Sequence, residues 1–112
     1  MSHKCAQWVF GRDVKGAEAA PGVTRKVLAY SDEMMSVANV FEKGAAVPMH
    51  SHPHTQIAYI VEGKFDFTVG DETKLVQKGD ALLCQNSEPH SCVCLEAGVV
   101  LDVFTPMRED FL

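Results

Sequence analysis

Four of the five histidines fall in two short segments, and imidazole is a common ligand of transition metals. His50 and His52 lie two residues apart in a stretch with extended character, so their side chains are expected on one face. Gln56 follows shortly after, and His90 opens a strand much further along. A single histidine is usually structural, but this set predicts a site for one divalent ion. Imidazole suits zinc, nickel, iron, manganese and cobalt alike.

The fourth candidate ligand is an amide, which affects the charge of the site. An amide oxygen cancels none of the metal charge, so three neutral histidines and Gln56 would leave a dication unneutralised. Such an ion is a stronger Lewis acid and attracts anions more strongly. The set also differs from the 2-His-1-carboxylate centre of iron oxygenases. We therefore expect Lewis-acid chemistry on a carboxylate. We expect His54, which follows Pro53, to lie at the rim of the site or to donate a hydrogen bond to one of the metal-coordinating residues.

Asp102 is a second group that could do chemistry. In the last predicted strand it alternates with apolar residues and shares a face with Val100 and Phe104, so it should point inward. A buried carboxylate is costly unless it is paired or used. It could form a structural bridge with Arg108 or another cation, or it could be a general acid/base beside the metal. Arg108 itself could be a solvated tail residue or an anion ligand.

The elements that must position these residues are short strands separated by turn residues. The predicted strands cover 23–30, 34–41, 46–50, 56–62, 64–69, 73–76, 81–84, 90–95 and 99–104, with breaks at Gly63 and at 96–98. This pattern is typical of an all-β sandwich or barrel. We expect one domain over 1–112, with an N-terminal arm (1–22), a barrel (23–105) and a tail (106–112) that has room for one helical turn. Within the arm, 8–10 could form an edge strand or pack on the barrel.

Composition excludes several classes of function. Net charge is −5 and the basic residues are scattered, so nucleic-acid binding is not expected. No apolar run approaches the roughly 20 residues of a membrane span, and the N-terminus does not resemble a signal peptide, so we expect a cytoplasmic protein. The four cysteines, Cys5, Cys84, Cys92 and Cys94, form no disulfide framework and are interpreted as small buried hydrophobes. A thiolate site of Cys92 and Cys94 with His90 is the less favoured alternative.

Two motifs carry a family resemblance. Residues 44–63 read G-x5-H-x-H-x3-Q-x6-G and resemble the first cupin motif, with Gln56 at the usual glutamate position. Residues 79–90 resemble the second motif, G-x5-P-x-G-x2-H, but Gln85 replaces the proline and Ser87 the glycine, while Cys94 replaces a later asparagine. The resemblance covers about 23–105. It implies a conical double-stranded β-helix with the metal inside. Together with the apolar faces of the predicted strands, it also suggests a homodimer that pairs through an edge strand.

A narrower resemblance lies in 50–56 and in the ending 101–112. Both are similar to the cupins of pectin degradation, which open the ring of 4,5-unsaturated uronates from pectate and alginate lyases to give linear keto-deoxyuronates. This implies an isomerase-type enzyme with a metal on His50, His52, Gln56 and His90. It also implies that Asp102, Phe104 and Arg108 bind or convert the substrate. Arg108 and the metal would bind the substrate carboxylate. Asp102 would transfer the proton, and Phe104 would pack against the sugar ring and shield it from water. The alternatives are a non-catalytic sugar-acid-binding cupin and a metal-dependent dioxygenase of a small organic acid.

Overall fold

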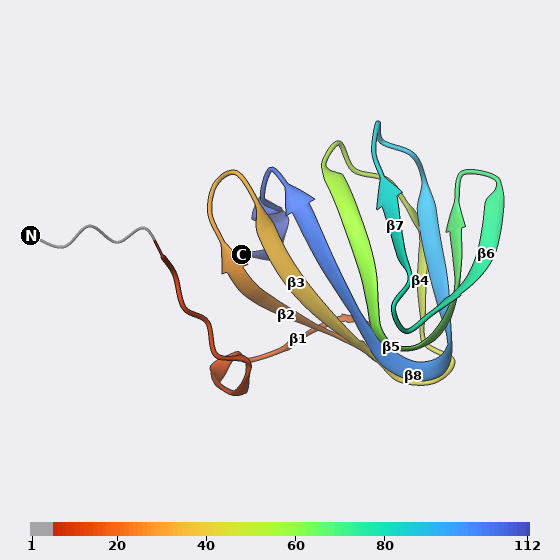
Figure 1. The fold of residues 1–112 in the computed structure, drawn as a ribbon, viewed down its shortest axis with the longest axis horizontal. Coiled ribbons are helices and arrows are strands. Elements are labelled where there is room, and N and C mark those ends of the chain that lie inside the picture. The colour runs from red at the N-terminus through yellow and green to blue at the C-terminus, as the bar shows by residue number, and fades with distance from the viewer. Residues whose placement is uncertain (1–5) are drawn as a thin grey trace, which may run out of the picture.

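Two long strands that bend through both walls organise the molecule (Figure 1). In the computed structural model, which describes residues 6–112, β5 (Thr55–Val69) and β8 (His90–Thr105) pair antiparallel along most of their length. Both strands bend at the foot of the barrel, so each contributes to both walls. The tapered, open interior between these walls is where the predicted site residues gather.

The remaining strands extend this pair on either side. The sheet order is β1-β2-β3-β8-β5-β6, with β4 paired to β8 and β7 paired to β5. The other strands are β1 (Ala17–Ala20), β2 (Val23–Tyr30), β3 (Met35–Phe41), β4 (Ala46–His50), β6 (Glu72–Gln77) and β7 (Ala81–Cys84). Among the described residues the only helical segments are two short 3-10 turns, η1 (Gly11–Asp13) and η2 (Glu109–Phe111). The all-β prediction and the helical turn in the tail are confirmed. None of the helical segments described is long and apolar enough to cross a membrane.

The predicted breaks at Gly63 and at 96–98 are wrong, because both strands continue through these residues as irregular, bulged pairs. A Cβ on Gly63 would lie 2.6 Å from the Glu96 carbonyl oxygen, and its φ of +92° disfavours other residues. A Cβ on Gly98 would collide with the backbone of Glu62. The two glycines therefore let the paired strands β5 and β8 approach closely and bend, where the sequence pattern suggested that they end.

The N-terminal arm also differs from the expectation. Strand β1 lies inside the predicted arm (1–22), in a part where no strand was expected, because its sequence, AEAA, carries no alternation. It forms through backbone pairing with β2. Residues 8–10 form neither a strand nor a packed arm, since Trp8 is 80% exposed and Phe10 51% exposed. In Figure 1 this part of the chain leads away from the barrel.

The interior of the barrel is apolar apart from the site residues. Ile60, Phe65 and Val100 are fully or almost fully buried in the main core cluster. Cys84, Cys92 and Cys94 are buried free thiols, while Cys5 lies outside the described residues. Burial raises the pKa of Cys84 to about 11 and that of Cys92 to about 12, so these thiols remain protonated and pack as small hydrophobes.

The close approach of β5 and β8 at Gly98 leads to a prediction about the free energy of unfolding. Gly98→Ala should lower the free energy of unfolding by about 1–3 kcal/mol, as overpacking does, because the new methyl group meets backbone that cannot move aside cheaply. Gly11→Ala is the matched control, because its Cβ would meet nothing within 4 Å. Urea unfolding measures both. Equal stability of the two variants would show that the strand pairing at Gly98 tolerates a side chain.

Candidate active site

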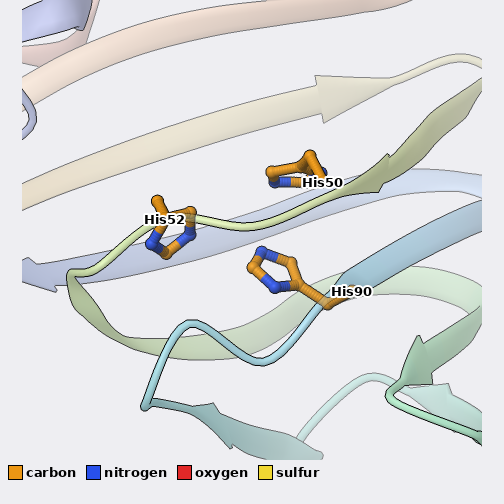
Figure 2. A group of neighbouring side chains, drawn as sticks. All are labelled: His50, His52 and His90. Atoms are coloured by element: carbon orange, nitrogen blue, oxygen red, sulfur yellow. The ribbon is translucent and has the colours of Figure 1, made fainter.

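Three histidines from two segments of the chain lie close together (Figure 2). His50 ends β4 and is paired in register with His90 at the start of β8, while His52 lies in the loop between β4 and β5. The ring centroids are 4.3 Å apart for His50 and His90, 4.9 Å for His52 and His90, and 5.9 Å for His50 and His52. One ring nitrogen from each lies within 4.8 Å of the others. The predicted convergence of the three imidazoles is confirmed.

Hydrogen bonds leave one nitrogen of each ring available as a ligand. Nδ1 of His50 lies 2.9 Å from the Pro48 carbonyl oxygen and Nδ1 of His90 3.0 Å from that of Glu88. A carbonyl only accepts, so both Nδ1 atoms carry the proton and both Nε2 atoms keep a lone pair. Nδ1 of His52, Nδ1 of His54 and Nε2 of His90 are buried without a hydrogen-bond partner among the described residues, and the first and last of these rings belong to the three-histidine group. Buried unpaired nitrogens that face one another are what a metal ion would satisfy.

Burial also keeps the cluster in the state that binds metals. Desolvation, aided by the positive charge of Arg108, lowers the pKa of His52 to about 4, and desolvation likewise lowers the pKa of His90. Both rings are therefore neutral at neutral pH, which is the form that coordinates an ion. His50 is the most exposed of the three and lies at the mouth. These residues fit a divalent metal ion, with His50, His52 and His90 as the residues that would hold it.

Gln56 lies between the histidines and Asp102. Its Oε1 is 2.9 Å from Nε2 of His52, and its Nε2 donates a hydrogen bond of 2.8 Å to Oδ1 of Asp102. A carboxylate only accepts, so Asp102 fixes the orientation of the amide and turns its oxygen toward the histidines. The amide oxygen only accepts, so His52 donates from Nε2 and keeps the lone pair of Nδ1. That Gln56 is itself a metal ligand remains a prediction.

Asp102 points into the interior, as the alternation predicted, and is 9% exposed. Its second oxygen, Oδ2, accepts a hydrogen bond of 2.7 Å from Nδ2 of Asn39. The structural bridge to Arg108 that we considered is not formed. Burial raises the pKa of Asp102 to about 7, against the opposing effects of Gln56, Arg108 and Asn39. A dication on the neighbouring histidines would lower it again.

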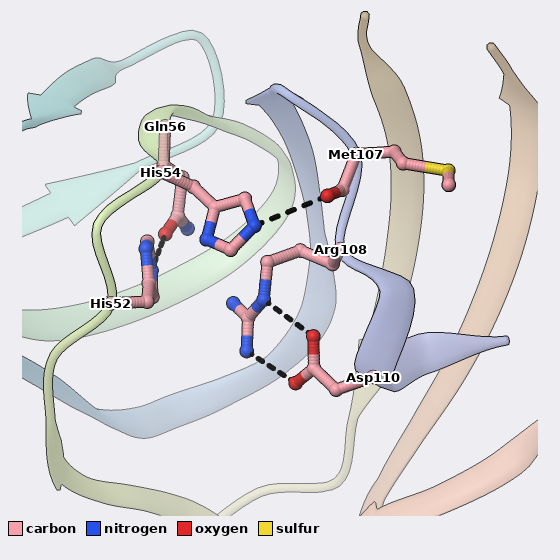
Figure 3. Close-up of polar contacts among 6 residues, drawn as sticks. All are labelled: His52, His54, Gln56, Met107, Arg108 and Asp110. Atoms are coloured by element: carbon pink, nitrogen blue, oxygen red, sulfur yellow. Dashed lines mark hydrogen bonds and ion pairs between the residues drawn. The ribbon is translucent and has the colours of Figure 1, made fainter. Parts of the chain in front are cut away.

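Arg108 is paired with another carboxylate, in the tail (Figure 3). Its Nε and Nη2 donate to the two oxygens of Asp110 at 3.0 and 2.8 Å. The Arg108 side chain is only 12% exposed, so the alternative of a solvated tail residue is wrong. Its Cζ lies 5.1 Å from the ring centroid of Phe104 and 4.3 Å from that of Phe111. The guanidinium is therefore held between aromatic rings and one carboxylate.

His54 connects the metal loop to this tail. Its Nε2 lies 3.1 Å from the carbonyl oxygen of Met107, which only accepts, so His54 donates (Figure 3). Its ring also lies against His52 and Phe104, with centroids 5.5 and 6.4 Å away. The prediction of a rim or supporting residue agrees with this position.

The turn before His90 keeps its geometry without the glycine of the motif. Asn86 and Ser87 both adopt left-handed backbone, with φ of 58° and 57°. Asparagine enters this region readily, whereas serine does so at a cost. His90 consequently stays in register opposite His50.

A cavity of about 310 Å³ joins these groups. Its lining includes His50, His90, Gln56, Asp102 and Phe104, together with Arg108 and Phe111 of the tail. Arg25, Asn39 and Phe111 are among the lining residues that the sequence did not single out. Alternation with Met35, Val37 and Phe41 places Asn39 on an inward face, and Arg25 lies between Val23 and Val27 in the same way. The parity used for Asp102 would have found both.

Comparison with known proteins agrees with this architecture. Residues 39–104 match the family described as "Cupin domain". The chain belongs to the cupin family. It is 40% identical over 97 residues to the pectin degradation protein KdgF of Dickeya dadantii (strain 3937), covering 85% of this chain and 88% of that protein. It is therefore a homologue of KdgF.

Two solved cupin structures superpose on almost the whole chain. The RmlC-like cupin from Shewanella frigidimarina matches with a TM-score of 0.91 and 34% identity, covering 96% of each chain. KdgF from Halomonas sp. matches with a TM-score of 0.91 and 31% identity, covering 96% of this cupin and 99% of that chain. The predicted cupin fold is confirmed by these matches.

The histidine cluster predicts the outcome of metal loading. The wild-type protein, loaded with nickel or zinc and desalted, should retain about one ion per chain, and His90→Ala should retain almost none, because it removes a buried lone pair from the cluster. His54→Ala is the control and should retain the ion, since His54 bonds to the tail. Elemental analysis measures both. Full retention by His90→Ala would exclude this ligand set.

Proposed function

We propose that this cupin opens the ring of 4,5-unsaturated uronates, giving linear keto-deoxyuronates during the breakdown of pectin or alginate. The observation that supports this most is one cavity lined by two of the three histidines, Asp102, Phe104 and Arg108. The kinship to a protein named for pectin degradation points to the same substrate class. Fold alone would not, because cupin-like scaffolds serve many unrelated functions.

The reaction is an isomerisation that needs only proton movements. The hemiacetal hydroxyl loses its proton, the bond between the anomeric carbon and the ring oxygen breaks, and the ring oxygen takes up a proton, so that an aldehyde and an enol form. The enol then loses its hydroxyl proton and gains a proton at the former alkene carbon, giving a ketone beside the carboxylate. Atoms and electrons balance without an oxidant, so an acid/base group and stabilisation of negative oxygen are what the protein must supply.

The residues in the cavity match these needs. Arg108, which keeps three N–H groups after pairing with Asp110, would bind the substrate carboxylate. Phe104 is 2% exposed and would pack against the sugar ring and exclude water. Asp102, fixed by hydrogen bonds on both oxygens, would move the proton. A divalent ion on the histidines would supply positive charge for the oxygens that become negative.

The role of Asp102 predicts a specific loss of activity. Asp102→Asn should reduce the rate of ring opening by roughly 10²–10⁴-fold, because an amide cannot shuttle a proton. The rate is followed by NMR on unsaturated galacturonate and on its alginate counterpart, with a protein-free sample that gives the spontaneous rate. Asp66→Asn is the matched control, because Asp66 alternates with the buried Phe65 and Phe67 and faces away from the core. Ring opening by Asp102→Asn at the rate of the control would contradict the proposal.

We also propose that two copies pair through an apolar outer face, and not through the edge strand expected from the sequence. This face is the outer side of the wall whose inner side carries Gln56 and Asp102. Ile57 is paired in register with Leu83 on one side and Val103 on the other, and Tyr59 is paired with Leu101. Ile57 is 49%, Tyr59 43% and Leu83 51% exposed. Such an apolar patch across three adjacent strands is unusual on a monomer, and a second copy presents the same patch for a symmetric contact.

A charge on this patch should separate the copies. Ile57→Asp should give a monomer, because an unpaired carboxylate would be buried between apolar side chains. Leu75→Asp is the control, since Leu75 is 59% exposed on β6, away from the patch. Light scattering coupled to size exclusion measures the mass of each. A wild-type monomer, or a dimeric Ile57→Asp, would contradict this interface.

A further inference from the structure

We infer that Arg25 is a second anion-binding residue of the cavity and acts with Arg108 on the substrate carboxylate. This inference rests on the proposed function and adds a residue from the opposite end of the chain to it. Arg25 lies on β2 and is paired in register with Asn39 on β3, whose amide holds Asp102. Residues paired in this way are neighbours on one face of a sheet. Arg25 therefore lies next to the residue that holds Asp102, the group proposed to move the proton.

Phe111 holds the two guanidinium groups in fixed places. Cζ of Arg25 lies 3.7 Å from the centroid of this ring and Cζ of Arg108 lies 4.3 Å from it. Contact with an aromatic face orients a guanidinium without using its N–H donors. Both groups line the cavity together with Phe111. The arrangement leaves the donors of both arginines available to a ligand.

The two arginines differ in how many of their N–H donors are free to bind a ligand. Asp110 occupies Nε and Nη2 of Arg108. Among the described residues, the Arg25 side chain makes no hydrogen bond or ion pair, so all of its donors are open. Burial and the charge of Arg108 lower the pKa of Arg25, while Asp110 opposes this. Two cations thus share one paired carboxylate, and an anion in the cavity would relieve their repulsion.

The ligand that this arrangement fits is a small carboxylate. Arginine matches the two oxygens of a carboxylate in a planar, two-pronged geometry. The cavity of about 310 Å³ has room for one sugar ring. A neutral sugar of equal size would leave the repulsion between the arginines in place. Arg25 should therefore contribute to the choice of sugar acids over neutral sugars.

The test compares binding and turnover in Arg25→Gln and wild type. Galacturonate, which lacks the alkene, is titrated by calorimetry alongside galactose, and ring opening of unsaturated galacturonate is measured separately. Arg25→Gln should weaken galacturonate binding and raise KM about 10- to 100-fold, as expected for losing a hydrogen bond to a charged group, with little change in kcat. Galactose binding should remain weak in both proteins, and the metal content should be unchanged.

Two further variants guard against a merely structural effect. Arg25→Lys keeps the charge and should restore part of the affinity for galacturonate, because only the two-pronged geometry is lost. Arg12→Gln is the matched control, since Arg12 lies 5.0 Å over the exposed ring of Phe10 on the arm and should bind as wild type does.

The outcomes for Arg25 and for the reaction can be told apart. Unchanged galacturonate binding in both Arg25 variants would overturn the inference, even if the wild type opens unsaturated rings. Binding that depends on Arg25 in a wild type that opens no ring would support the anion site and overturn the proposed reaction. Loss of binding in Arg25→Gln with partial recovery in Arg25→Lys, in an active enzyme, supports both.

Discussion

The site depends on the carboxamide of Gln56, because this one group offers a hydrogen-bond donor to Asp102 and an acceptor to His52. Its nitrogen donates to the buried Asp102, and its oxygen faces His52 at 2.9 Å. A glutamate here would set a second carboxylate against Asp102, and one of the two would have to take up a proton. The amide avoids this repulsion and adds no negative charge beside the histidines. Asp102 and a dication can therefore occupy one small interior.

This network requires the register of three neighbouring strands. Asn39, Gln56 and Asp102 come from β3, β5 and β8, which are adjacent in the sheet. A shift of one residue in any of these strands would turn its polar side chain to the outer face. Gly63 and Gly98 allow the close, irregular pairing at which β5 and β8 bend between the two walls. Residues far from the chemistry are therefore part of what positions it.

Much of this could be predicted from the sequence, wherever a local pattern has a single structural meaning. The alternation around Asp102 and the H-x-H pair placed these side chains correctly. A glycine inside a β pattern is compatible with either a strand end or a bulge, and the pairing with the neighbouring strand determines which of them forms. Strand β1 left no local signal, because it depends on backbone pairing with β2. The Arg108–Asp110 pair depends on the short turn η2, which brings together two side chains that are two residues apart.

The site is divided between a sheet that would hold the metal and a tail that would hold the anion. His50 and His90 lie on paired strands, whereas Arg108 and Phe111 lie in the last residues of the chain. The tail is anchored by the hydrogen bond from His54 to the Met107 carbonyl and by Phe111 between two guanidinium groups. Met107 and Phe111 also pack on the cluster of Met35, Val37 and Phe104, but no strand pairing holds the tail, so it can change with less effect on the sheet. Changes in the tail should therefore alter which sugar acid binds, while the histidine cluster stays intact.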